Sequence, residues 1–251
     1  MRRTIALAIA ALVLVVPEEV LGAPLEEGTP AAGPVVAVLG SPGGRDLRPD
    51  IVWRRIPFGA RRKRQMAAYS RRHYGRRAFV LRHPQVVVEH YTSGTSFDSA
   101  WNHFAANGVH LGERPGVCAH FLIDTDGTIH QLVNLRLRCR HAIGMNWTAI
   151  GIEHVGTNAG QVLGNARMMR ASLRLTVWLM ARFEISWGNV IGHAETLQSP
   201  FHVERYRSWR CRTHADLNHA EMRRYRRRVR PLARRLDVPI GDRPAWVDSG
   251  C

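Results

Sequence analysis

The feature that most constrains the fold is the run of residues 85–92, in which three consecutive valines are followed by Glu89, His90 and Tyr91. An apolar run of this length, rich in β-branched residues, is typical of a strand buried on both faces. Binding sites in α/β sheets form at the carboxyl ends of such strands, so the pattern predicts that His90 lies at the rim of a sheet. Two later segments, residues 189–195 and 212–216, offer partners of similar chemistry.

These segments predict a metal site. His193 lies in the first of them, and His214 and Asp216 lie in the second. Two imidazoles and one carboxylate are ordinary ligands of Zn²⁺, and three protein ligands leave a fourth position open for water. That arrangement is typical of a catalytic rather than a structural zinc site.

A buried acid is predicted in a second strand, residues 149–155, where Glu153 stands among isoleucine and valine. An unpaired carboxylate in such a strand is costly, so Glu153 either meets an arginine or serves a site. Both interpretations stay open from the residues alone. If the two strands share a sheet, Glu153 and His90 come together despite their separation along the chain.

The other elements complete a domain in which strands and helices are interspersed. Residues 117–124 and 128–133 alternate in polarity around an Asp-Gly turn and predict a hairpin, in which His120 faces inward. Helices are predicted over residues 98–107, with Ser96 as the cap, over residues 165–183, beginning at Asn165, and over residues 199–209 and 222–236, the last bent or interrupted at Pro231. This order indicates an α/β or α+β domain whose sheet is covered by helices.

The first residues of the chain have the pattern of an export signal. Two arginines precede an apolar stretch, residues 4–16, which is shorter than the roughly 20 residues that span a bilayer. We therefore expect a signal peptide over 1–23, an uncleaved anchor being the alternative, and a secreted, periplasmic or wall-associated protein. A Pro- and Gly-rich linker over 24–50, a folded domain over 51–236 and a tail over 237–251 complete the predicted organisation.

Export makes the four cysteines candidates for disulfides. Three pairings are possible, and free buried thiols are the alternative. Cys118 and Cys139 flank the predicted hairpin, which favours their pairing and leaves Cys211 with Cys251.

The formal net charge of +16 comes almost wholly from arginine, because Lys63 is the only lysine. An exported cationic protein is attracted to anionic polymers such as those of a cell wall. The export signal and the lack of a nucleic-acid-binding motif argue against nucleic acid as the partner. Nothing in the sequence indicates a stable protein partner.

Six segments in one order carry a resemblance to a known family. They are residues 88–92, 119–127, 140–144, 149–153, 190–193 and 213–216. Together they resemble the zinc-dependent N-acetylmuramoyl-L-alanine amidases, which are related to phage amidase lysozymes and to peptidoglycan recognition proteins. The resemblance extends from about residue 51 to residue 236 and implies a central mixed sheet flanked by helices.

The resemblance also implies roles for the site residues. Zinc is expected on His90, His193 and a third ligand, a position that Asp216 matches. Many relatives carry a lysine where this chain has His214, so His214 is either a catalytic group or the third ligand in place of Asp216.

Glu153 is expected to act as the general base, and His214 to donate to the oxyanion. His141 and Asn146, in the polar loop before the second strand, are the expected substrate contacts.

The implied function is zinc-dependent hydrolysis of the amide bond between N-acetylmuramic acid and L-alanine, in peptidoglycan or in muropeptides. The alternative is a non-catalytic peptidoglycan-binding module. That alternative predicts the loss of a zinc ligand or of the acid, and this chain keeps all of them.

Overall fold

The structure is a computed structural model that describes residues 47–242 and 246–251. The predicted signal peptide and most of the predicted linker lie outside these residues. No helix among the described residues is long and apolar enough to cross a membrane.

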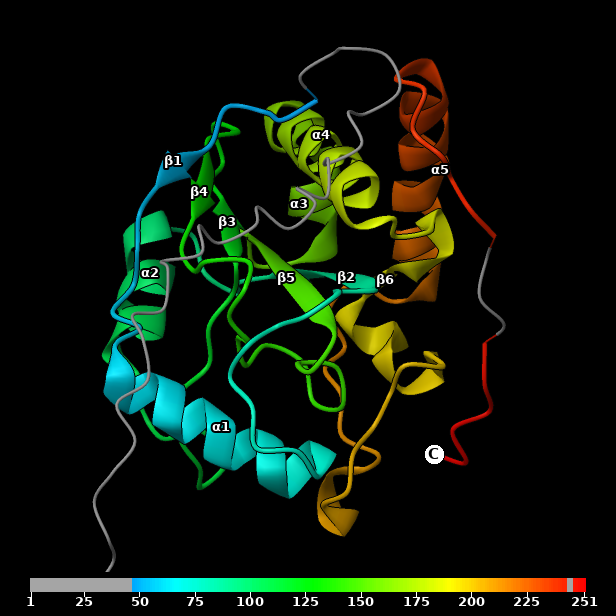
Figure 1. The fold of residues 1–251 in the computed structure, drawn as a ribbon. Coiled ribbons are helices and arrows are strands. Elements are labelled where there is room, and N and C mark those ends of the chain that lie inside the picture. The colour runs from blue at the N-terminus through cyan, green and yellow to red at the C-terminus, as the bar shows by residue number, and fades with distance from the viewer. Residues whose placement is uncertain (1–46, 243–245) are drawn as a thin grey trace, which may run out of the picture. The chain divides into compact units, whose positions relative to one another are not determined.

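The described residues form a six-stranded sheet with the strand order β1-β4-β3-β5-β2-β6 (Figure 1). The strands are β1 (Val52–Trp53), β2 (Val86–Tyr91), β3 (Phe121–Ile123), β4 (Ile129–Gln131), β5 (Ala149–His154) and β6 (Val190–Gly192). β2 is parallel to β5 and to β6, and β3 is parallel to β5 but antiparallel to β4. The sheet is therefore mixed, which confirms the predicted fold class.

The two strands with the longest apolar runs occupy the middle of the sheet. The three valines of β2 and the two isoleucines of β5 are fully buried. Full burial of such a side chain stabilises the fold by about 1.5–3 kcal/mol. Positions inside the sheet keep these side chains away from water and so retain this stabilisation. Their central, parallel pairing aligns their carboxyl ends.

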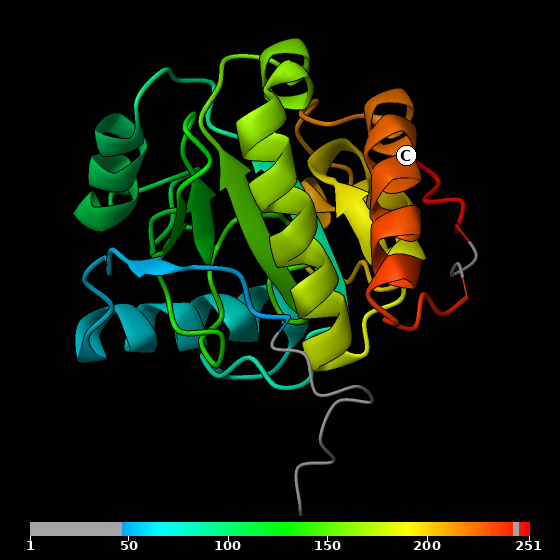
Figure 2. The same cartoon turned by 90° about the horizontal axis from the view of Figure 1, so that it is seen from above.

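Helices cover the sheet on both sides. α3 (Ala159–Gly164), α4 (Ala166–Phe183) and α5 (His219–Arg235) pack against one another, and Figure 2 shows α4 and α5 lying along one face of the sheet. α1 (Ala60–Tyr74) lies on the other side, and α2 (Phe97–Ala106) lies near the β1 and β4 edge (Figure 1).

Side-chain caps fix where the helices begin. The Ser96 hydroxyl accepts a hydrogen bond from the Ser99 N–H at the start of α2, and the Asn165 side chain accepts from the second and third residues of α4. Both caps satisfy N–H groups that have no partner inside the helix. The predicted starts of these two helices are confirmed.

Two helix predictions need correction. Residues 199–206 form no helix, because the segment bonds to other parts of the chain: the Val203 N–H donates to the Gly144 carbonyl and the Arg205 N–H to the His73 carbonyl. Only the short 3₁₀ turns η2 (His193–Gln198) and η3 (Arg207–Trp209) flank it, while η1 (Trp187–Asn189) precedes β6. α5 runs through Pro231, so of the two predicted outcomes at this residue, a bend or an interruption, the interruption is wrong.

Both predicted disulfides, Cys118–Cys139 and Cys211–Cys251, are present. The second bond attaches the C-terminal residues to the domain, and the Val247 N–H donates to the Gln198 carbonyl. The described part of the predicted tail is thus packed against the folded unit.

Candidate metal and catalytic site

The parallel strands bring the predicted site residues to one edge of the sheet. His90 on β2 is the register partner of Glu153 on β5, and Glu89 is the partner of Gly192, the last residue of β6. His193 follows β6 directly and begins η2. Sequence positions 63 and 103 residues beyond His90 therefore meet because three strands end together.

His90, His193 and Asp216 form a group whose ligand atoms lie within 4.8 Å of one another. The Nδ1 atoms of the two histidines are 3.0 Å apart, and the Asp216 oxygens lie 3.3 Å from His90 Nδ1 and 3.2 Å from His193 Nδ1. A tetrahedral ion with bonds of about 2.0–2.1 Å requires ligand atoms roughly 3.3 Å apart. The three residues therefore fit a zinc ion by donor type and by spacing.

The protonation of these groups also favours metal binding. Burial, together with the nearby His193, lowers the pKa of His90 to about 4, so its imidazole is neutral at pH 7. Burial alone would raise the pKa of Asp216, but the adjacent His193 and His90 hold it well below its usual range. A neutral imidazole and an ionised carboxylate are the forms that coordinate metal ions.

His141 orients the first of these ligands. His90 Nε2 lies 3.1 Å from His141 Nδ1, and His141 Nε2 lies 3.3 Å from the Ala149 carbonyl oxygen. Because a carbonyl only accepts, His141 donates from Nε2, accepts at Nδ1, and thereby places the His90 proton on Nε2. This leaves the lone pair of His90 Nδ1 directed at His193 and Asp216.

Gly151 makes room for the ring of His141. A Cβ atom at position 151 would lie 2.6 Å from His141 Cγ, which is closer than the two atoms can approach. The glycine in the middle of β5 is thus required for the contact between the two histidines. This requirement is tertiary, because Gly151 and His141 are not on the same element.

A buried acid supports the loop that carries His193. Glu195 is fully buried, and its carboxylate accepts hydrogen bonds from the Gly192 N–H at 3.1 Å and from the Arg226 guanidinium at 2.6 and 2.8 Å. It also lies 2.8 Å from His219 Nδ1. Both carboxylate oxygens are therefore held. Sequence reasoning missed Glu195 and Arg226, although a charged residue on the apolar side of α5 is a signal for a buried pair.

Asp216 is tied to the same loop through the backbone. The Ala194 N–H donates to the Asp216 carbonyl at 3.1 Å, and the Thr213 hydroxyl donates to the His193 carbonyl at 2.7 Å. The two segments that supply the second and third candidate ligands are thus held together independently of any ion.

Glu153 has no arginine partner among the described residues. Its Oε2 atom is buried without a hydrogen-bond partner. Burial, with a smaller contribution from the charge of Asp216, raises the pKa of Glu153 to about 8. Of the two interpretations that the sequence left open, the geometry favours the one in which Glu153 belongs to the site.

The remaining predicted residues fall in different places. His214 is exposed and stacks on His193, with ring centroids 5.1 Å apart, and it is not part of the ligand group. Asn146 is fully buried; its side chain accepts from the His141 and Ala142 N–H groups and donates to the Tyr74 hydroxyl. Asn146 therefore braces the loop from inside, and its contact with substrate stays a prediction.

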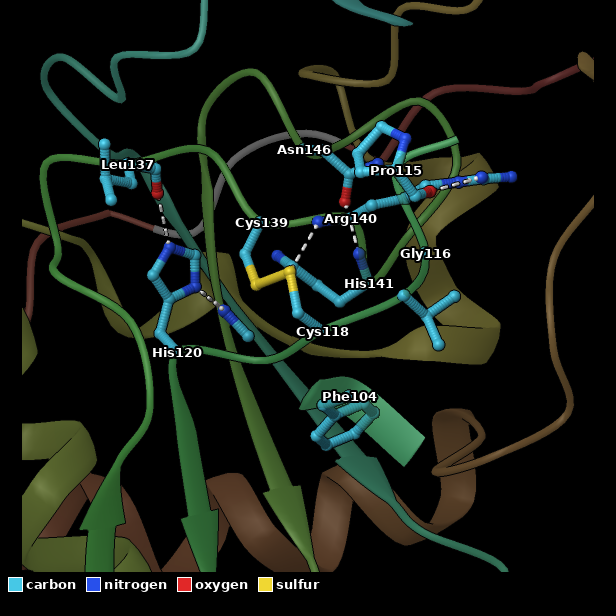
Figure 3. The surroundings of a disulfide bond; sticks show 12 residues. Phe104, Pro115, Gly116, Cys118, His120, Leu137, Cys139, Arg140, His141 and Asn146 are labelled. Atoms are coloured by element: carbon cyan, nitrogen blue, oxygen red, sulfur yellow. Dashed lines mark hydrogen bonds between the residues drawn. A yellow bond between two sulfur atoms is a disulfide. The ribbon is translucent and has the colours of Figure 1, made fainter. Parts of the chain in front are cut away.

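The Cys118–Cys139 disulfide braces the same loop from the other side (Figure 3). His120, which the hairpin pattern placed inward, has its Nε2 atom 2.9 Å from the Leu137 carbonyl and accepts at Nδ1 from the Gly151 N–H. The Arg140 guanidinium donates to the Pro115 and His110 carbonyls. These contacts fix the backbone on which His141 stands.

A polar network lies on the core side of β2, and the sequence did not reveal it. His154 donates from Nδ1 to the His90 carbonyl at 2.7 Å and accepts from the Ser172 hydroxyl. Glu89 accepts from the Thr176 hydroxyl, and burial raises its pKa to about 8 despite this hydrogen bond. The network joins the backbone of His90 to α4.

Comparison with known proteins identifies the family of this chain. The sequence model of one family, described as N-acetylmuramoyl-L-alanine amidase, matches residues 81–216, which is more than half of the chain. The chain belongs to this family. The match includes the three residues of the ligand group and Glu153.

A curated relative, the N-acetylmuramoyl-L-alanine amidase A of Achromobacter lyticus, is 43% identical over 67 residues, which are 26% of this chain and 38% of the relative. This chain thus matches well under half of that relative's length.

Similar solved structures include the amidase AmiD from E. coli, in complex with the substrate anhydro-N-acetylmuramic acid-L-Ala-D-gamma-Glu-L-Lys. It is 24% identical, with 46% of this chain and 50% of that chain covered, and the TM-score is 0.37. Another is the Drosophila Peptidoglycan Recognition Protein SA, 21% identical, with coverages of 54% and 83% and a TM-score of 0.40.

Proposed function

We propose that this chain hydrolyses the amide bond between N-acetylmuramic acid and L-alanine in peptidoglycan or muropeptides, with zinc held by His90, His193 and Asp216. One observation carries the proposal: a ligand group with zinc-like spacing stands beside an acid that has no other partner, in a chain of the amidase family. A recognition module needs no such acid.

A zinc ion held there would supply Lewis acidity, which acidifies water and polarises a carbonyl oxygen. The protein supplies the proton transfers. Glu153 takes a proton from the attacking water as the oxygen of the water bonds to the carbonyl carbon. It then returns this proton to the amide nitrogen as the carbon–nitrogen bond breaks. Its position beside His90 in the sheet register supports this role.

His214 is the proposed hydrogen-bond donor to the oxyanion that forms on the carbonyl oxygen. Its exposed ring, stacked on His193, leaves the edge of the imidazole accessible to a substrate. A donor placed where negative charge develops stabilises the transition state more than the ground state. His141, partly exposed, stays a predicted substrate contact in addition to holding His90.

Export belongs to the same proposal. The apolar segment near Met1 supports a signal peptide, although it lies outside the described residues. Two disulfides among the described residues are typical of an oxidising compartment outside the cytosol. Both properties suit a protein that meets a cell wall.

The test is to incubate the purified protein, loaded with zinc, with sacculi and with soluble muropeptides, and to identify the products by mass spectrometry. We expect peptides with a free L-alanine amine and glycan that has lost its peptides. The Glu153→Gln variant is the matched control and should release neither. Binding to sacculi without any product would instead identify a peptidoglycan-binding module.

A further inference from the structure

A hollow lies at the end of the sheet opposite the His-Asp group. It has a volume of about 830 Å³ and is lined by residues 80–84 before β2, residues 134–136 after β4, and the last turns of α4. β2 begins on this side and ends at Tyr91, next to His90, and β4 is antiparallel to β3, so these segments all lie at the edge away from the metal ligands. The volume is within the range of ligand-binding clefts.

Four arginines contribute to the wall of this hollow. Arg48, Arg82, Arg136 and Arg182 line it and are exposed, and none of its described lining residues is acidic. Among the described residues, no ion pair involves Arg82, Arg136 or Arg182, so no carboxylate neutralises their charge. The exposed guanidinium groups of Arg82, Arg136 and Arg182 therefore carry positive charge that no described carboxylate neutralises, and such charge attracts an anion.

Aromatic rings contact two of the four arginines of the hollow, Arg48 and Arg182. Those of Arg48 and Arg182 lie 5.9 and 5.6 Å from the ring centroid of Trp178, a side chain that is only 9% exposed. The ring of Trp53, another lining residue, is in turn covered by the guanidinium of Arg55, which lies 4.2 Å from its centroid but does not itself line the hollow. Cation–π contacts of this kind orient the arginines before any ligand arrives. They also occupy the ring surfaces on which a nucleic-acid base would stack.

We propose that this hollow binds a linear chain of polyol or sugar units joined by phosphodiesters. The guanidinium fork matches two phosphate oxygens at once, which a point charge does not. A concave wall with several such forks suits a chain that carries phosphates at intervals, and its covered aromatic faces do not suit nucleic acid. The site is separate from amide hydrolysis and would hold the protein on an anionic polymer beside its substrate.

The test measures binding of a short synthetic glycerol phosphate oligomer to the full chain by calorimetry, with a single-stranded oligonucleotide as the comparison. The hollow variant is Arg82→Gln/Arg136→Gln/Arg182→Gln. The control variant, Arg223→Gln/Arg227→Gln/Arg234→Gln, removes the same charge from exposed positions of α5 that have no side-chain partner among the described residues. Thermal melting checks that both variants are folded.

We expect the hollow variant to lose at least about tenfold in affinity for the oligomer, because charge-assisted contacts to phosphate are lost, while the control variant binds like the wild type. Equal losses in both variants would reduce the effect to net charge and overturn the proposal. No loss in the hollow variant would also overturn it, and equal or tighter binding of the oligonucleotide would overturn the choice of polymer.

Glu153→Gln separates this proposal from the proposed function. The variant should release no muropeptide product yet bind the glycerol phosphate oligomer as the wild type does. If it lost oligomer binding, the hollow would not be an independent site. Failure of the wild type to hydrolyse muropeptides, with oligomer binding intact, would count against the amidase proposal alone.

Discussion

At the scale of single residues, the site depends on which atom of each side chain faces the others. His90 is useful as a ligand only if its proton is on Nε2, and His141 is the group that places it there. Glu153 is useful only because no arginine neutralises it. Both conditions are met by neighbours that lie on other strands or loops.

The first prediction concerns Glu153→Gln. We expect the variant to keep zinc, because Glu153 is not one of the three ligands, and to lose at least about 10² in turnover, because the amide cannot accept a proton. Zinc content and turnover on a muropeptide are the measurements. Glu184→Gln, an exposed acid at the end of α4, is the control and should be unaffected. Near-normal turnover in Glu153→Gln would remove the general-base assignment.

The second prediction concerns His141→Ala. Without the acceptor at position 141, no other described residue fixes the proton of His90 on Nε2, and groups that orient a ligand in this way contribute about 10–100-fold to metal affinity. Competition with a chelator should therefore show weaker zinc binding by that factor. His103→Ala, an exposed histidine on α2, should leave the affinity unchanged. An unchanged affinity in His141→Ala would mean that the contact does not tune the metal site.

The third prediction separates His214 from Asp216. Asp216→Ala should lose zinc, whereas His214→Ala should keep it and lose about 10 to 10³ in turnover, as expected for an oxyanion donor. Metal analysis of both variants decides the question. The opposite pattern of metal loss would give a ligand set of three histidines.

At the scale of elements, α5 is connected to the site through one buried ion pair. Arg226 on α5 donates two hydrogen bonds to Glu195, at the start of η2, and one to the Val190 carbonyl of β6. Helix, strand and ligand-bearing loop therefore share one polar group. The sequence indicates the amphipathic helix, but the partner of its buried arginine is 31 residues away.

The fourth prediction is that Arg226→Met destabilises the fold by about 3–5 kcal/mol, because it leaves the buried carboxylate of Glu195 without its main counter-charge. Urea unfolding of the wild type and the variant gives the free-energy difference. Arg227→Met, exposed on the same helix, is the control and should change the free energy of unfolding by less than about 0.5 kcal/mol. Replacing Glu195 as well, with Gln, should recover part of the loss. A single variant as stable as the control would show that the pair is not needed.

At the scale of the whole molecule, buried neutral histidines set how the fold responds to acid. His120 is fully buried, and this burial lowers its pKa from the ordinary value of 6.5 to about 4. Between these pH values the unfolded chain binds a proton that the folded chain does not. The free energy of unfolding therefore falls as pH drops through this window and levels off near pH 4.

The fifth prediction is that His120→Gln makes the fold less sensitive to acid, because glutamine does not titrate. Lowering the pH from 7 to 5 should cost the wild type about 2 kcal/mol more than the variant, whatever the variant's stability at pH 7. Denaturant unfolding at the two pH values measures both quantities. His103→Gln, exposed on α2, should follow the wild type, and an equal acid response in His120→Gln would assign the sensitivity to other groups.

The sequence by itself determined the local features of this protein. Its apolar runs predicted β2 and β5, and its capping residues predicted where α2 and α4 begin. Six short segments in one order identified the family and the three residues that the structure groups as ligands. These inferences succeed because periodicity and capping are properties of neighbouring residues. They fail at residues 199–206, where bonds to distant carbonyls replace the predicted helix.

Only the tertiary structure decided how the site is held. The pairing of Glu195 with Arg226, the contact of His141 with His90 and the burial of Asn146 all join residues from different elements. No local pattern specifies such pairs, because they depend on strand register and on how helices pack over the sheet. The physical reason is that a buried polar group must find a partner in three dimensions, and the chain offers many candidates at every sequence separation.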